Sequence, residues 1–356
     1  MTRSCALTAG LTLVLSITAP SVAAASNGHL VEAGPAWAGN ALVWGEASKN
    51  GALSVMRRHP GKSPAVLYRV PAPTERNIEQ NFMGLPGSLT ASSRWVTFAF
   101  DRATCEYDGD SVACQGNTHA MGAHDGKAFR DLLPQREAAA YIATATDRDD
   151  LAIADSEDTC DGELGSRIWL LHGDDSPVVI GTVDPHHVMR QVAMAGPWIA
   201  WIDSDADSIT VAERDTGRKV VTFSVADFGG AYDIDTFAID RKGHIAALTG
   251  KQPDCFYVCL RMLSITNRRP RTLSRRAGEF SLAMNDGKLI YQAVDKQGGG
   301  RLLLTNLRGK VIRQLDQTSQ TRRIDHDVAF DGRRVAWALA LGEYPGTLGK
   351  VRSVRL

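Results

Sequence analysis

The sequence predicts an all-β fold of seven repeated units, a seven-bladed β-propeller. A short phrase, a polar turn followed by an apolar run, returns seven times, centred on Leu42, Val96, Leu151, Ile199, Ile245, Leu289 and Val335. Successive copies are separated by 44 to 55 residues, which is typical of propeller blades. Helical periodicity is almost absent, and runs rich in β-branched residues alternate with turn residues.

The chain begins with a segment that has the three parts of a secretory signal. Arg3 precedes an uncharged apolar run, and alanines at 23–25 supply the small residues that a signal peptidase requires. The apolar stretch 5–17 is shorter than the roughly 18 residues that a membrane-spanning helix needs. We therefore expect a signal peptide over 1–25, a single propeller domain over 26–356, and a secreted or periplasmic protein with no membrane insertion after signal removal.

Most repeats can be divided into four strands, and the fourth repeat is the clearest example. Its strands are expected at 191–196, 198–203, 208–214 and 219–225. The last repeat offers only three strands, whereas His29 to Ala33 is a strand without a repeat of its own. Because an unpaired edge strand promotes aggregation, we expect this N-terminal strand to pair with Lys350 to Arg355. It would complete the last blade and close the ring.

Aromatic residues recur at matching positions of the repeated strand. They are Trp44, Phe98, Trp201, Tyr291 and Trp337. This recurrence indicates packing between blades rather than a stacking platform for a sugar or a nucleic acid.

The formal net charge is +0 and the pI is about 7.1, which argues against a general attraction to nucleic acid or anionic membranes. The charge is unevenly distributed along the chain. It is −8 over 26–180, −5 over 181–235 and +12 over 236–356. In a closed ring these segments would give one acidic and one basic side, which could orient the molecule against a charged partner.

The sixth repeat resembles the repeat of TolB-type propellers. The segment 285–315 has the turn, the apolar strand, the glycine-bearing hairpin and the final Arg-Gln-Leu stretch of that repeat. The characteristic Ser-Pro-Asp-Gly turn is reduced to Asp-Gly at 286–287 and 331–332. The resemblance implies the propeller fold and protein binding in the cell envelope, and it brings no catalytic residue.

Five cysteines follow the leader, all expected between the second and third strands of their repeats. In an exported chain, cysteines close in sequence usually form disulfides. We therefore expect the pairs Cys105–Cys114 and Cys255–Cys259, with Cys160 left as a thiol. Zinc is disfavoured because the sequence has no paired CxxC motif and no histidine at ligand spacing.

Asp203, Asp205 and Asp207 place three carboxylates on alternate residues. Such oxygens suit Ca²⁺, but the glycine and glutamate of a complete calcium loop are missing. The alternatives are an acidic hairpin turn and a weak calcium site. The sequence predicts no other cofactor.

Three loops are expected to meet at the mouth of the central channel. Their candidate ligand-binding residues are Asp184, His186, His187, Tyr232, Asp233, Arg323 and His326. The sequence has no nucleophile elbow, no HExxH motif and no phosphate-binding loop. We therefore expect a non-catalytic binding or scaffold module for a protein or an envelope polymer. The alternative is a propeller hydrolase or lyase with its site at the channel mouth.

Overall fold

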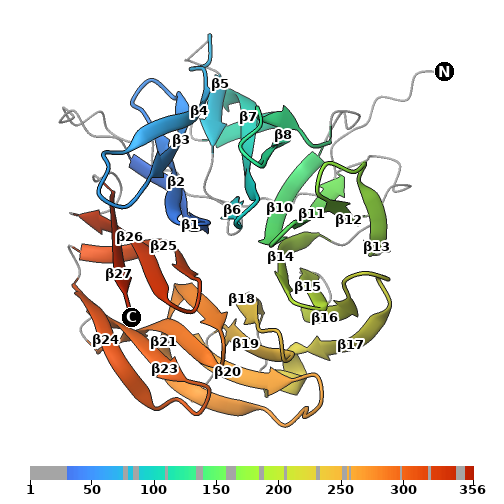
Figure 1. Ribbon diagram of the computed structural model, residues 1–356, viewed down its shortest axis with the longest axis vertical. Helices are drawn as coiled ribbons and strands as arrows, with labels where there is room; N and C mark the ends of the chain where they lie inside the picture. The colour runs from blue at the N-terminus through green and yellow to red at the C-terminus, as the bar shows by residue number, and fades with distance from the viewer. Residues whose placement is uncertain are drawn as a thin grey trace.

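The computed structural model describes residues 30–74, 79–82, 88–108, 111–133, 139–157, 166–183, 188–203, 207–229, 233–250, 255, 258–296, 299–319, 322–341 and 349–356. Apart from the 3₁₀ turn η1 (Val225–Phe228), the regular structure of these residues consists of strands. The sheets lie around a central axis, and the chain passes round the ring so that the first and last sheets are neighbours (Figure 1). The all-β prediction is confirmed.

Three sheets are four-stranded meanders in which neighbours in the chain pair antiparallel. They contain β1 (Leu30–Ala38), β2 (Ala41–Ala47), β3 (Leu53–Arg58) and β4 (Ala65–Val70); β10 (Ala139–Asp147), β11 (Asp150–Glu157), β12 (Arg167–His172) and β13 (Val178–Thr182); and β14 (Met189–Ala195), β15 (Trp198–Asp203), β16 (Ser208–Glu213) and β17 (Lys219–Ser224). The first strand of each sheet lies nearest the centre of the ring (Figure 1).

The second sheet along the chain has a divided inner strand. It contains β5 (Glu79–Phe82), β6 (Leu89–Ala91), β7 (Trp95–Asp108), β8 (Ser111–His124) and β9 (Arg130–Asp131). Both β5 and β6 pair antiparallel with β7, at different positions along it. The two short strands therefore share the place that one strand takes in the other sheets.

The largest sheet has seven strands and joins two repeats. Its strands are β18 (Ile234–Ile239), β19 (His244–Thr249), β20 (Val258–Ser264), β21 (Arg271–Asn285), β22 (Lys288–Val294), β23 (Gly300–Asn306) and β24 (Val311–Thr318), in this order. The first half of β21 pairs with β20 and its second half with β22, and Ala277 has partners in both strands. Thus β21 is the outer strand of one four-stranded unit and the inner strand of the next.

The last sheet contains β25 (Arg322–Phe330), β26 (Arg334–Leu341) and β27 (Lys350–Arg355). The predicted pairing of the N-terminal strand with this sheet is wrong. Leu30 pairs with Ala47, so β1 belongs to the first sheet. Gly34 and Pro35 resemble a strand break in the sequence, but irregular register between Val31 and Ala36 accommodates them within one long strand.

The first and last sheets meet through their side chains, in a contact that we call the terminal junction. Val31, Leu42 and Trp44 of the first sheet form one buried cluster with Ala336 and Ala338 of the last. The aromatic residues predicted to pack between blades are all buried, each 5% exposed or less. That prediction is confirmed, and the terminal junction contains one of those residues, Trp44.

Candidate functional site

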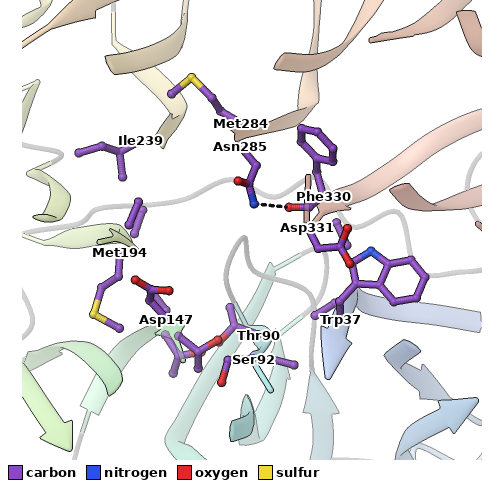
Figure 2. Close-up of a pocket in the computed structure, with 18 of the residues that line it drawn as sticks. Trp37, Thr90, Ser92, Asp147, Met194, Ile239, Met284, Asn285, Phe330 and Asp331 are labelled. Carbon is purple, nitrogen blue, oxygen red and sulfur yellow. Dashed lines mark hydrogen bonds between the residues drawn. The ribbon is translucent and has the colours of Figure 1, made fainter. Parts of the chain in front are cut away.

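A central cavity of about 520 Å³ opens where the inner strands turn into the second strands. Figure 2 shows side chains from β1, β6, β10, β14, β18, β21 and β25 around it. Apolar side chains such as Met194 and Met284 face this space beside polar ones. Asp147, Asp240 and Asp331 bring carboxylates to its lining.

The carboxylate of Asp147 holds three turns together. It accepts a hydrogen bond from the backbone N–H of Gly196 at 2.8 Å. It also lies 3.3 Å from Arg241 and 3.6 Å from Arg214. Because these partners come from the two following units, Asp147 fixes neighbouring inner strands relative to one another.

Asp240 stabilises its own turn. Its side chain is 3% exposed and accepts hydrogen bonds from the backbone N–H groups of Lys242 at 2.9 Å and His244 at 3.0 Å. The Nδ1 atom of His244 lies 2.8 Å from its other oxygen. This is the local side-chain-to-backbone bonding that makes aspartate a turn former.

Arg334 connects the last sheet to the first. Its guanidinium bonds to Asp331 at 2.7 Å through Nε and donates to the carbonyl oxygen of Gly39 at 2.5 Å through Nη2. It also lies over the ring of Trp37, 4.1 Å from the centroid, in cation–π geometry. One arginine therefore contributes two interactions across the terminal junction, while its bond to Asp331 holds it in place within the last sheet.

Further hydrogen bonds join the turns around the cavity. The N–H of Gly39 donates to the Ser92 carbonyl at 3.1 Å, and the Ser92 hydroxyl donates to the Arg148 carbonyl at 2.5 Å. Asn285 donates through Nδ2 to the Phe330 carbonyl at 3.4 Å (Figure 2). We call this set the turn ring: Gly39, Ser92, Asp147, Arg148, Gly196, Arg241, Asn285, Phe330, Asp331 and Arg334.

The sequence contains a signal for the turn ring. Asp147, Asp240, Asn285 and Asp331 each stand at the end of an inner strand, directly before a turn. An aspartate or asparagine at this position usually bonds only to the backbone of its own turn. Because two of these side chains also reach neighbouring units, their spacing marks the positions where units are linked.

The predicted ligand-binding loops lead into the inner strands, at the end opposite the cavity mouth. Asp184, His186, His187 and Tyr232 lie outside the described residues. Asp233 is exposed, and its carbonyl accepts from the N–H of Gly250 at 2.8 Å.

Arg323 and His326 lie in β25, where the backbone alone is described for them. The register of β25 shifts between Ile324 and Val328, so His326 falls in an irregular part of the strand. The predicted ligand-binding set stays a prediction.

The predicted calcium residues lie around the turn between β15 and β16. Asp203 is the buried last residue of β15, and Asp205 lies outside the described residues. Asp207 has a φ of 44°, and its carbonyl accepts from the N–H of Val225 at 2.9 Å. Among the described residues, no group of three or more His, Cys, Asp or Glu side chains could hold a metal ion. The calcium site stays a prediction.

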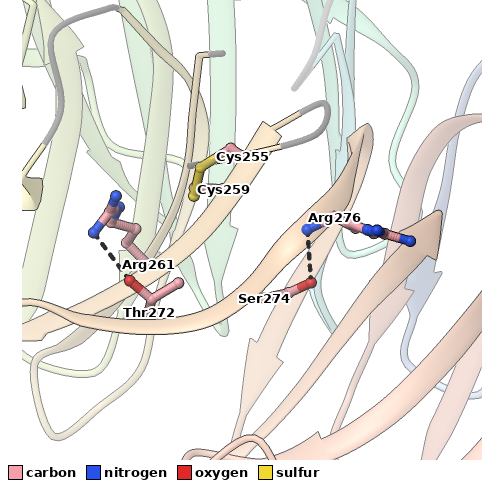
Figure 3. Close-up of a disulfide and its surroundings, with 6 residues drawn as sticks. All are labelled: Cys255, Cys259, Arg261, Thr272, Ser274 and Arg276. Atoms are coloured by element: carbon pink, nitrogen blue, oxygen red, sulfur yellow. Dashed lines mark hydrogen bonds between the residues drawn. A yellow bond between two sulfur atoms is a disulfide. The ribbon is translucent and has the colours of Figure 1, made fainter. Parts of the chain in front are cut away.

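The Cys255–Cys259 disulfide is present, with a Cα–Cα distance of 5.6 Å (Figure 3). Cys259 is itself a buried residue of β20 (Val258–Ser264), and two residues further along this strand Arg261 donates to Thr272 of β21 at 3.0 Å. This prediction is confirmed.

Cys105 and Cys114 are directly opposite each other in the register of β7 and β8. The structure describes only the backbone at these two positions, and Cys160 lies outside the described residues. The Cys105–Cys114 disulfide therefore stays a prediction.

Glu32 of β1 is a titratable group with a strongly altered pKa. It lies on β1 between Val31 and Ala33, where the register is irregular. Burial raises its pKa from 4.5 to about 7, because the charged carboxylate loses hydration.

No helix within the described ranges is long and apolar enough to cross a membrane.

No protein-family profile matches the chain, and no curated protein matches it. Solved structures do match. The β-propeller domain of the Trilobed protease from Pyrococcus furiosus has 10% identity and a TM-score of 0.53, over 93% of this chain and 96% of that one. That propeller domain has an open velcro topology.

Two peptidases are also similar. One comes from a study of two prolyl endopeptidases, with 9% identity and a TM-score of 0.54 over 92% of this chain. The other is a puromycin-hydrolyzing peptidase of Mycobacterium tuberculosis, with 14% identity and a TM-score of 0.54, again over 92% of this chain. The chain spans about half the length of these two peptidases, 50% and 51%. At such identities the likeness shows the fold alone, and that fold is a β-propeller.

Proposed function

We propose that this chain is a seven-bladed β-propeller that acts as an exported, non-catalytic binding module for a protein or an envelope polymer. The pairing of β21 with both β20 and β22 supports this blade count, because it divides the seven-stranded sheet into two units. Removal of residues 1–25 as a signal peptide would deliver the module to the periplasm or the medium. The TolB-like repeat at 285–315 supports the same location.

The proposal rests on one observation: the carboxylates that line the cavity are already bound by groups of the protein itself. Asp147 is bound by Gly196 and two arginines, Asp240 by its own turn, and Asp331 by Arg334. A general acid or base must be able to exchange its proton with a substrate. Carboxylates already held by backbone N–H groups and guanidinium groups are suited instead to keeping a scaffold rigid.

The charge distribution supports a polar partner. The acidic segment 26–180 and the basic segment 236–356 occupy different sides of the ring (Figure 1). The loops that carry Asp184, His186, His187, Tyr232, Asp233, Arg323 and His326 would supply the contact residues at the channel. A Cys105–Cys114 disulfide and weak Ca²⁺ binding at Asp203, Asp205 and Asp207 are parts of the same proposal.

A propeller hydrolase or lyase is the second candidate. The observation that favours it is the similarity of this chain to structures from peptidases. Such an enzyme would need His186 or His326 to meet Asp184 at the channel mouth, within hydrogen-bond reach of a substrate.

The test is affinity capture from a cell-envelope extract with the mature chain as bait, at low and high salt. We expect saturable capture of the same partner by the wild type and by the cavity variant Met194→Ala, and its loss from a triple variant of His186, His187 and His326 to alanine. Unchanged capture by the triple variant would contradict the proposed loops. Turnover of a peptide or ester substrate that disappears in His326→Ala would establish the enzyme instead.

A further inference from the structure

The last sheet has an open edge at β27. In the four-stranded units, an outer strand such as β4, β13, β17 or β24 covers the third strand. In the part of the chain that the structure describes, no strand covers the outer edge of β27. Six residues are available there, which is enough for a paired strand of about 20 Å.

The register defines which backbone groups face this edge. Leu356 donates to the Arg333 carbonyl at 2.8 Å, and Arg355 is opposite Arg334. Hydrogen-bonded and non-hydrogen-bonded pairs alternate along an antiparallel ladder. The N–H and C=O groups of Val351, Ser353 and Arg355 therefore point away from β26, toward the open edge.

The side chains along this edge are basic. Lys350, Arg352 and Arg355 are exposed on β27 itself. Arg352 lies 3.6 Å from the carboxylate of Asp316 on β24, so Lys350 and Arg355 contribute most of the positive charge. Arg313 of the neighbouring β24 donates to the Arg355 carbonyl at 3.4 Å, which adds a further positive charge. A second copy of β27 would place arginines against arginines, and such like-charge pairs are unfavourable.

A second cavity, of about 350 Å³, lies beside the end of β27. Ser353 and Arg355 line it together with Arg58 and His59 from the first sheet. Arg334 also lines it, but its charge is already matched by Asp331. A strand paired with β27 would therefore have a cationic cavity within reach of its side chains.

We propose that the outer edge of β27 binds an extended acidic segment of a partner protein as a fourth strand, with a carboxylate of that segment in the cavity beside Arg58, His59 and Arg355. Backbone hydrogen bonds to Val351, to Ser353 and to the N–H of Arg355 would provide affinity, and the cavity would provide selectivity. The Arg355 carbonyl already accepts from Arg313. The inference rests on the proposed binding function and names the chemistry of the partner.

The test is a fluorescence-anisotropy titration of the mature protein with a labelled ten-residue peptide of alternating Thr and Glu with blocked ends. Ser353→Pro removes an outward N–H but no hydrogen bond to β26, and Ser353→Ala is its matched control. We expect Ser353→Pro to bind at least about tenfold more weakly than Ser353→Ala, since both variants lack the hydroxyl and only the proline lacks the N–H. Arg355→Glu should bind more weakly than the wild type, with a smaller salt dependence.

A Thr-Lys peptide and a Thr-Glu peptide N-methylated on alternate residues are the controls on the ligand side. The methylated peptide tests backbone pairing on the unaltered protein, so the outcome does not depend on the folding of Ser353→Pro. Absence of binding, equal binding by Ser353→Pro, or equal binding of either control peptide would overturn the inference. If any of these results is obtained but the mature chain still captures a partner from the envelope extract, the proposed binding function stands. Only the assignment of the β27 edge as the binding surface is then rejected.

Discussion

Two junctions between neighbouring units are built in different ways. The fifth and sixth units share β21, whose backbone pairs with β20 on one side and β22 on the other; we call this the continuous junction. The terminal junction has no shared strand, and its contacts are the cluster around Trp44 and the bonds of Arg334. The continuous junction opens only if a strand is pulled from a sheet. The terminal junction needs only the separation of side chains, so we expect the ring to open there first.

The largest effect is expected from Trp44→Ala. Removing a buried tryptophan costs about 3–5 kcal/mol of unfolding free energy, and here it weakens the contact between the first and last sheets. Hydrogen exchange should show lower protection in both sheets, although they are far apart in sequence. In the continuous junction, Tyr291→Ala should affect only the neighbouring strands. Loss of protection confined to the first sheet in Trp44→Ala would contradict this view of the terminal junction.

A pH effect should arise at Glu32 on β1. Because its folded pKa is raised to about 7 from 4.5, the folded protein binds a proton between these values that the unfolded chain has released. The free energy of unfolding should therefore fall as pH rises through this window, by about 3 kcal/mol, and level off above it. Denaturant titrations at several pH values would measure the fall. Glu32→Gln should remove most of it, and an equal fall in that variant would assign the effect to other groups.

Arg334→Ala should have the next largest effect. It removes the bonds to Gly39 and Asp331 and the contact with Trp37, at a cost of about 2 kcal/mol for a partly exposed group. Arg333→Ala is the matched control, because that neighbouring side chain is exposed and should change stability by less than about 0.5 kcal/mol. Chemical denaturation of both variants measures the difference. Equal effects would show that Arg334 contributes little to the terminal junction.

The smallest effect is expected at the junction between β14 and β18. Gln191 accepts from Phe237 N–H and the Thr236 hydroxyl at 3.0 Å each, and donates to the Phe237 carbonyl at 3.1 Å. Gln191→Ala leaves these groups without their partner, at a cost of about 1–2 kcal/mol. The exposed neighbour Arg190→Ala should be neutral in the same thermal unfolding measurement. A cost above that of Arg334→Ala would reverse the expected order of the junctions.

The repeated strands could be predicted because a recurring apolar phrase in the sequence indicates which residues are buried. Leu151, Ile199 and Val335 are fully buried in second strands, as the repeated phrase indicates. The place of the N-terminal strand could not be predicted in the same way. Gly34 and Pro35 interrupt the apolar pattern of β1, and only the observed register shows that bulges keep the strand continuous.

The candidate site was less predictable than the fold. The histidine and aspartate residues of the loops predict a ligand site there, because these residue types often act in ligand binding. The turn ring depends instead on contacts such as Arg334 with the Gly39 carbonyl, between residues from opposite ends of the sequence. Sequence spacing predicts that turns recur, but it does not specify which side chain crosses to which neighbouring unit.

The continuous strand β21 also restricts how this repeat protein could change in length. Elsewhere in the described ring, an outer strand and the next inner strand are separate elements, so a duplicated or deleted repeat begins and ends between sheets. At β21 the same cut would fall inside a strand of 15 residues. Gene duplication or loss in this part of the chain would have to copy or remove the fifth and sixth repeats as a pair, because a single copy would carry half a strand into a sheet that has no partner for it.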